Sequence, residues 1–288
     1  MHLNHIRYGS GRPLLLVHGL GGSWRSWCLV LARLAEHREV IAIDLPGFGG
    51  SRQLEGPASI AALADSVAAF TRSMGLENVD AVGSCLGGRV VLELVRRRGV
   101  LASAVALDPC GFARGWQRHA FFTSVWLANR TLRGLRPELP PLTRTATGRA
   151  VLLAQFSTNA RAMPAEVVLD EVRCFAGARS LDQVLFDLAF GEVPKGLPEG
   201  AGAHPLSIGW GRSDRVCFPN QASHAASLFP DAQLHWFDRC GHFPQWDAPE
   251  ETVRLVLEST GERPFSAPAG SSATPHELAL MSSVACRA

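Results

Sequence analysis

The sequence of 288 residues predicts an α/β protein with a mostly parallel, doubly wound sheet and an inserted helical segment. Short apolar runs alternate with helical patterns along most of the chain, which is typical of a parallel sheet covered by helices on both faces. The length allows one substantial core. With 47% hydrophobic and 19% charged residues, the composition is that of a globular protein.

The predicted strands are short, apolar and buried. They are Leu14–His18, Val40–Leu45, Val79–Gly83, Ser103–Asp108, Leu206–Trp210 and Gln233–Phe237. Helical patterns lie between the first five of them. Ser59 is expected to cap a helix over residues 60–74, and a second helix is expected from Leu86 to Arg98, where Gly99 ends it.

The alternation breaks between Phe112 and Glu199, where the pattern is helical and interrupted by prolines. Roughly 85 residues between two strands are too many for a crossover loop, so a separate helical element is expected. We therefore divide the chain into a first core part (1–112), a helical insertion (113–199), a second core part (200–260) and a tail (261–288). The tail is rich in Pro, Ser, Ala and Gly and is expected to be disordered.

Charge and cysteine content exclude several classes of function. The net charge of +2 is too small to indicate nucleic acid or a membrane surface. No apolar run is long enough for a membrane span, and no signal peptide is evident. The seven cysteines form no CxxC pair, which argues against a disulfide framework and a zinc site. We expect a cytoplasmic protein with reduced thiols, no metal and no cofactor.

The string Gly83-Ser84-Cys85-Leu86-Gly87-Gly88 lies directly between a predicted strand and a predicted helix. Such a sharp turn exposes the side chain at its third position, and glycines two residues before and after it leave room for neighbouring backbone. That position is Cys85, the expected nucleophile. Ser84 is out of frame, because Val82 and Leu86 flank it by two residues.

A Gly-rich loop follows the first predicted strand, in the string Val17-His18-Gly19-Leu20-Gly21-Gly22. The N–H groups of Leu20 and Leu86 are expected to form an oxyanion hole. A phosphate-binding loop is the alternative, but the string lacks GxGxxG and a GKS or GKT ending.

An acid and a histidine follow in the chain. Asp214 comes just after a predicted buried strand, and His242 lies in the loop after the last one. The order nucleophile, acid, histidine is that of a Cys-His-Asp triad on this kind of sheet. Asp108, at the end of an earlier strand, is the alternative acid.

These motifs together resemble the α/β-hydrolase superfamily over residues 6–260. The resemblance rests on His18-Gly19, on Asp44-Leu45-Pro46-Gly47-Phe48-Gly49, on the turn at Cys85, on Asp214 and on Gly241-His242. It implies that the insertion is a helical cap over the substrate cavity. The departure is Cys85, since most members carry Ser there. The Gly-x-Cys-Leu-Gly-Gly string resembles the turn of dienelactone hydrolases and polyhydroxyalkanoate synthases, whose overall layout differs.

Cysteine changes the expected chemistry. A neighbouring histidine can lower the pKa of a thiol until a thiolate–imidazolium pair exists at rest, and Cys85 is expected to behave so. We expect a hydrolase of esters or thioesters that acts through an acyl-enzyme on Cys85. The alternatives are an acyltransferase or thioesterase acting on acyl groups bound to CoA or a carrier protein, and a catalytically dead binding protein. Cys110, Cys217 and Cys240 are expected to be packing residues.

The first half of the insertion carries many more basic than acidic residues. Seven arginines stand against Glu138: Arg114, Arg118, Arg130, Arg133, Arg136, Arg144 and Arg149. They could dock coenzyme A phosphates or an acyl carrier protein, or simply form a solvated surface. Phe121, Phe122, Trp126 and Leu127 are expected to give the insertion an apolar underside.

Overall fold

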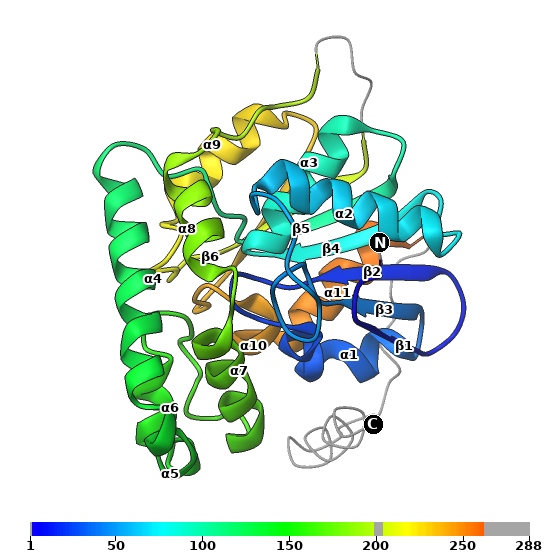
Figure 1. The fold of residues 1–288 in the computed structure, drawn as a ribbon. Helices are drawn as coiled ribbons and strands as arrows, with labels where there is room; N and C mark the ends of the chain where they lie inside the picture. Colours follow the sequence, from blue (N-terminus) through cyan, green and yellow to red (C-terminus); the bar gives the residue numbers. More distant parts are fainter. Residues whose placement is uncertain (1, 199–203, 262–288) are drawn as a thin grey trace.

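The computed structural model describes residues 2–198 and 204–261. Within them a seven-stranded sheet has the order β1-β3-β2-β4-β5-β6-β7, with β1 antiparallel and the other strands parallel (Figure 1). The strands are β1 (His5–Tyr8), β2 (Pro13–Val17), β3 (Glu39–Ile43), β4 (Val79–Ser84), β5 (Leu101–Leu107), β6 (Leu206–Gly211) and β7 (Gln233–Phe237). The prediction of a mostly parallel α/β sheet is confirmed.

Alternate residues of the central strands pack into two separate cores, one on each face of the sheet. Leu15 and Val17 of β2 belong to the core formed with α2 (Ile60–Ser73), α3 (Leu86–Arg97) and α9 (Gln221–Leu228). Leu14 and Leu16 belong to the core formed with α1 (Cys28–Ala35) and α11 (Pro249–Thr260). The two-residue period of a strand turns successive side chains to opposite faces, so both faces are covered by helices.

In the described part of the chain between β5 and β6, five α-helices gather on one side of the sheet (Figure 1). They are α4 (Trp116–Gly134), α5 (Leu139–Arg144), α6 (Ala146–Leu152), α7 (Ala165–Gly177) and α8 (Leu181–Phe190), and we call residues 116–190 the helical segment. α7 packs on the short helix η1 (Trp24–Trp27), which follows β2, and Arg179 N–H donates to the Gly47 carbonyl, which follows β3. The segment therefore lies against loops at the carboxyl edge of the sheet.

Some expectations fall outside this description or need correction. Residues 262–288 of the predicted tail lie outside the described residues. Cys28 is disulfide-bonded, contrary to the expectation of reduced thiols throughout, while Cys85, Cys110, Cys174, Cys217 and Cys240 are free. Among the described helices, none has both the length and the apolar character that a membrane crossing requires.

Candidate active site

Cys85 sits on the sharp turn between β4 and α3, with φ 55° and ψ −112°. A positive φ is unfavourable for a residue with a side chain, and it persists only where the surroundings impose it. Here the surroundings are the flanking glycines. A Cβ on Gly83 would overlap the Gly87 carbonyl, and a Cβ on Gly87 would overlap the Val17 carbonyl. The chain can therefore turn this tightly only with glycine at both positions.

Ser84 is buried and engaged elsewhere. The side-chain amide of Gln245 donates to Ser84 Oγ at 3.1 Å. The Ser84 hydroxyl is therefore part of the packing behind the turn, where it contacts Gln245.

The Gly-rich loop after β2 approaches Cys85 closely. A Cβ on Gly19 would lie 3.1 Å from Cys85 Cβ. The loop is held as a turn in which Gly22 N–H donates to the Gly19 carbonyl at 3.1 Å. Within the described residues, the N–H groups of Leu20 and Leu86 donate no backbone hydrogen bond outside regular elements.

His242 and Asp214 meet beside Cys85. His242 Nδ1 lies 2.8 Å from Asp214 Oδ2, and both side chains are fully buried. Asp214 Oδ1 is fixed separately by the N–H groups of Val216 and Cys217, at 2.7 and 3.0 Å. The other ring nitrogen, Nε2, has no hydrogen-bond partner among the described residues. The histidine is thus held from one side and open on the other.

Asp108, the alternative acid, is turned to a different partner. Its Oδ1 accepts the Gly211 N–H at 2.8 Å, and its Oδ2 has no partner among the described residues. Burial and the nearby negative charge of Asp214 raise the pKa of Asp108 well above its usual value. These surroundings favour the neutral form of Asp108, and the carboxylate that contacts His242 is Asp214.

The thiol of Cys85 is more deeply buried than the sequence suggested. Burial, followed by contact with Cys110, raises the pKa of Cys85 well above its usual value, although His242 acts in the opposite direction. The expectation of a low thiol pKa is wrong for this geometry, because it counted the histidine and not the loss of solvent. Burial alone would lower the pKa of His242. The opposing effects of Asp214 and Cys85 are larger, and together they raise this pKa well above its usual value.

Sulfur, nitrogen and oxygen atoms crowd this site closely enough to hold a metal ion in principle. One ligand atom each from Cys85, Cys110 and His242 lies within 4.8 Å of the others, and so does one each from Asp214, Cys217 and His242. Sequence reasoning treated Cys110 and Cys217 as packing residues. The available signal was their position just after neighbouring strands, since the carboxyl ends of parallel strands meet at one edge.

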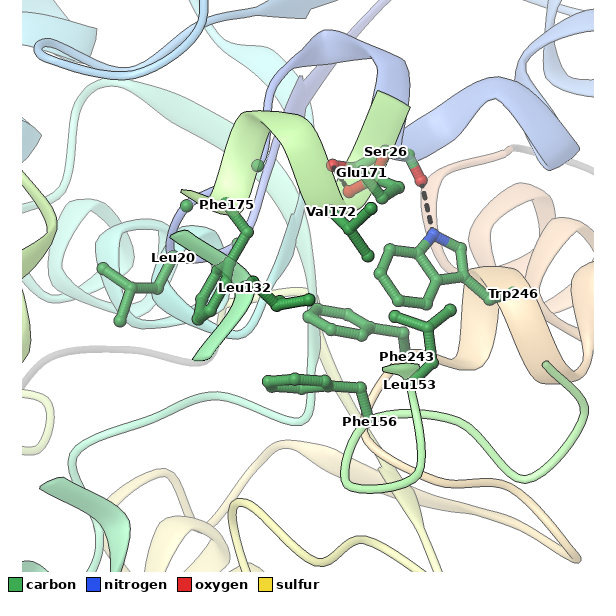
Figure 2. Close-up of a pocket in the computed structure, with 13 residues that line it drawn as sticks. Leu20, Ser26, Leu132, Leu153, Phe156, Glu171, Val172, Phe175, Phe243 and Trp246 are labelled. Atoms are coloured by element: carbon green, nitrogen blue, oxygen red, sulfur yellow. Dashed lines mark hydrogen bonds between the residues drawn. The ribbon is translucent and has the colours of Figure 1, made fainter. Parts of the chain in front are cut away.

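An apolar cavity of about 30 Å³ lies between the Gly-rich loop and the helical segment (Figure 2). Its side chains from the segment are Leu132, Leu153, Phe156, Glu171, Val172 and Phe175. Phe243 and Trp246, next to His242 in the chain, complete the wall. The predicted underside is different, since Trp126 and Leu127 are exposed and Phe121 is buried away from the cavity. The stripe of α4 that faces inward carries Phe121, Val125, Asn129 and Leu132, and of these Leu132 lines the cavity.

Glu171 is the ionisable side chain among the residues that line this cavity, and no sequence motif points to it. It is 6% exposed, accepts a hydrogen bond from Ser26 Oγ at 3.1 Å, and leaves Oε1 without a partner. Burial raises its pKa from the usual 4.5 to about 8. At neutral pH the carboxyl is therefore mainly protonated and can donate as well as accept a hydrogen bond.

Replacing Glu171 with glutamine is expected to stabilise the protein at alkaline pH. Because the folded pKa lies above the unfolded one, folding stability falls as pH rises from about 4.5 to about 8, by on the order of 4 kcal/mol in total. Glutamine stays neutral and removes this loss. Urea unfolding at pH 5 and pH 8.5 measures it, with Glu166→Gln, at an exposed position of the same helix, as the control. Equal pH dependence in the parent and in Glu171→Gln would contradict the assignment.

The helical segment is bonded directly to the histidine loop. His242 N–H donates to the Phe156 carbonyl at 2.9 Å. Asp247 accepts hydrogen bonds from Ser157 Oγ at 2.5 Å, Thr158 N–H at 2.8 Å and Gly241 N–H at 2.7 Å. The segment and the loop that carries His242 therefore share one hydrogen-bond network.

Several arginines of the segment bind within it. Arg133 and Arg136 donate to the Ala176 carbonyl near the end of α7, at 3.0 and 2.9 Å, and Arg118 donates to the Ala189 carbonyl near the end of α8. Cations are favourable at helix C-termini, where carbonyl groups lack partners. Part of the positive charge is therefore used to fix the helices of the segment to one another.

The fold and the turn at Cys85 together define an enzyme of the α/β-hydrolase class. The model of the alpha/beta hydrolase family matches residues 14–255, and the chain belongs to that family. It is 27% identical to a 2-hydroxy-6-oxo-2,4-heptadienoate hydrolase of Pseudomonas putida, over 86% of this chain and 88% of that one. It is 28% identical to the dihydrolipoyllysine-residue acetyltransferase component of an acetoin cleaving system of Pseudomonas putida, covering 86% of this chain and 63% of the relative.

Solved structures show the same fold. A thermophilic esterase from Thermogutta terrifontis superposes with a TM-score of 0.67 at 22% identity, covering 89% of this chain and 92% of the other. At this identity the likeness concerns the fold alone.

Proposed function

We propose that this enzyme hydrolyses carboxylic esters or thioesters through a covalent acyl-enzyme on Cys85, with His242 as the proton carrier and Asp214 as the group that orients it. The observation that carries the proposal is the buried Asp214–His242 contact of 2.8 Å, which leaves His242 Nε2 unpartnered beside a cysteine on a strained turn. Residues 113–199 are proposed to act as the cap that covers the acyl group.

The steps follow from this geometry. His242 Nε2 takes the thiol proton as Cys85 Sγ attacks the carbonyl carbon, and Asp214 stabilises the imidazolium that forms. The carbonyl oxygen becomes an oxyanion that the N–H groups of Leu20 and Leu86 can bind. Collapse expels the alcohol or thiol, which receives the proton from His242. Water, deprotonated by His242, then attacks the thioester and releases the acid and the free thiol.

Burial of the thiol gives this cycle a particular requirement. Burial favours the protonated thiol of Cys85, and Nε2 of His242 is the unpartnered nitrogen beside it that can act as the base. Asp214 strengthens that base by raising the pKa of His242. We therefore propose that the nucleophile is formed when the substrate arrives.

Acyl transfer is the second candidate, favoured by the chemistry of a thioester intermediate and by the acetyltransferase component among the relatives. Amines, alcohols and thiols attack thioesters readily, so an acceptor that displaced water would convert the hydrolase into a transferase. Coenzyme A or an acyl carrier protein would then be the carrier, with the arginines of the helical segment as candidate docking groups.

Intact-protein mass after brief incubation with a panel of acyl thioesters and aryl esters tests both candidates. The expected result is one acyl adduct, located on the tryptic peptide of residues 73–89, that is absent from Cys85→Ala. Decay to the free acid indicates hydrolysis, and decay only in the presence of an added thiol or amine indicates transfer. Turnover without any adduct on that peptide would contradict the covalent route.

A further inference from the structure

Three buried thiols lie in a row that begins at the proposed nucleophile. Cys85 Sγ is 3.1 Å from Cys110 Sγ, and Cys110 Sγ is 3.3 Å from Cys217 Sγ. All three are free and buried. Cys85 follows β4, Cys110 follows β5 and Cys217 follows β6, so the pairing of these parallel strands brings the three together.

The backbone at the first pair suits a covalent link. Cys110 N–H donates to the Cys85 carbonyl at 3.2 Å, and Cys85 N–H donates to the Leu107 carbonyl at 2.8 Å. This contact holds the two backbones together, and the sulfurs, 3.1 Å apart, need to approach by only about 1 Å to bond. The Cys217 thiol is in hydrogen-bond contact with Cys110 and not with Cys85. Cys110 is therefore the thiol next to the proposed nucleophile.

We propose that hydrogen peroxide oxidises Cys85 and Cys110 to a disulfide, which withdraws the nucleophile reversibly and protects it from irreversible oxidation. The loss of activity rests on the proposed function, in which Cys85 is the nucleophile, whereas the acyl-transfer steps do not need Cys110.

The electrons balance in two steps. His242 Nε2 takes the Cys85 proton, the sulfur attacks one peroxide oxygen, and the O–O bond breaks to give a sulfenic acid and hydroxide, which the imidazolium converts to water. The Cys110 sulfur then attacks the sulfenic sulfur, the S–O bond breaks, and the second water leaves with the Cys110 proton. Two thiols and one peroxide thus give one disulfide and two waters.

Tryptic mapping distinguishes the possible pairings, because the three cysteines fall on separate peptides, residues 73–89, 99–114 and 216–239. The folded protein is treated with hydrogen peroxide, quenched in acid, alkylated under denaturing conditions and digested without reductant. The expected product is a link between peptides 73–89 and 99–114. A thiol reductant is expected to abolish it and to restore iodoacetamide labelling of Cys85.

Two variants sharpen the test. In Cys110→Ala, Cys85 is expected to pass to sulfinic and sulfonic acid at peroxide levels that give the disulfide in the parent. Cys217→Ala removes an equally buried thiol and is expected to keep the 73–89 to 99–114 link. If Cys110→Ala does not fold, judged by circular dichroism, the linked peptide of the parent protein decides alone.

Three results would overturn the proposal. They are irreversible oxidation of Cys85 in the parent without a link, a link only between 99–114 and 216–239, and an unmodified Cys85 under excess peroxide. Each result is read by mass from protein that has not been exposed to an acyl substrate. The test is therefore independent of the outcome of any turnover assay.

Discussion

Replacing Cys85 with alanine is expected to lower kcat/KM by about 10⁴-fold or more while leaving the fold intact. Loss of a nucleophile removes the covalent route altogether, and such losses in related triads are on this scale. The side chain is small and 4% exposed, and alanine retains the Cβ, so the strained turn is unchanged. Steady-state rates on the best ester or thioester, with circular dichroism as the folding control, measure the effect. Full activity in Cys85→Ala would refute the covalent mechanism.

Cys85→Ser separates a thiol enzyme from a serine hydrolase with a tolerated replacement. Serine is a far weaker acid than cysteine, and the buried site already disfavours the charged nucleophile, so a loss of about 100-fold or more is expected. The shorter C–O bond also moves the attacking atom back toward the turn. Activity equal to or above that of the parent would show that the site is built for an alkoxide.

Asp214→Asn is expected to cost about 10⁴-fold in kcat, by analogy with triads in which the wrong histidine tautomer results. It should also move the acidic limb of the pH–rate profile to lower pH, because Asp214 is a cause of the raised pKa of His242. A substitution that merely loosened the fold would lower the rate without that shift. The profile is measured with a substrate whose leaving group does not titrate in the same range.

Asp108→Asn is the matched control. Burial favours the neutral form of Asp108, and the amide oxygen of asparagine can accept the Gly211 N–H as the carboxyl does. The expected change in kcat is below about 10-fold, in keeping with a group that does not contact the reacting atoms. A large loss of kcat in Asp108→Asn together with a small loss in Asp214→Asn would reverse the assignment of the acid.

The fold could be predicted because apolar runs and turn glycines are local signals. All six predicted strands are present, with ends shifted by at most two residues, and the helix capped by Ser59 begins at Ile60. β1 was missed since it is a half-exposed edge strand, His-Ile-Arg-Tyr, without an apolar run. The order of Cys85, Asp214 and His242 along the chain could be found by motif alone, whereas their roles stay predictions for the variants above.

The surroundings of the site could not be predicted. Burial of Cys85 and its contact with Cys110 depend on which strands lie side by side, and no single segment of sequence encodes that. Glu171 is one acid on an amphipathic helix, indistinguishable in sequence from a surface residue. The wrong expectation for the pKa of Cys85 has the same origin, since a neighbouring histidine can be inferred from a motif and desolvation cannot.

The bond from His242 N–H to the Phe156 carbonyl has a mechanical consequence. If the helical segment moved as a rigid body at this point, it would pull His242 away from Cys85, and the proposed reaction would stop. Asp247 also accepts hydrogen bonds from Ser157 and Thr158, so this part of the helical segment is expected to stay fixed to the loop that carries His242. The substrate is then expected to enter by motion in another part of the helical segment. His242 would keep its alignment with Cys85 while substrate binds and product leaves.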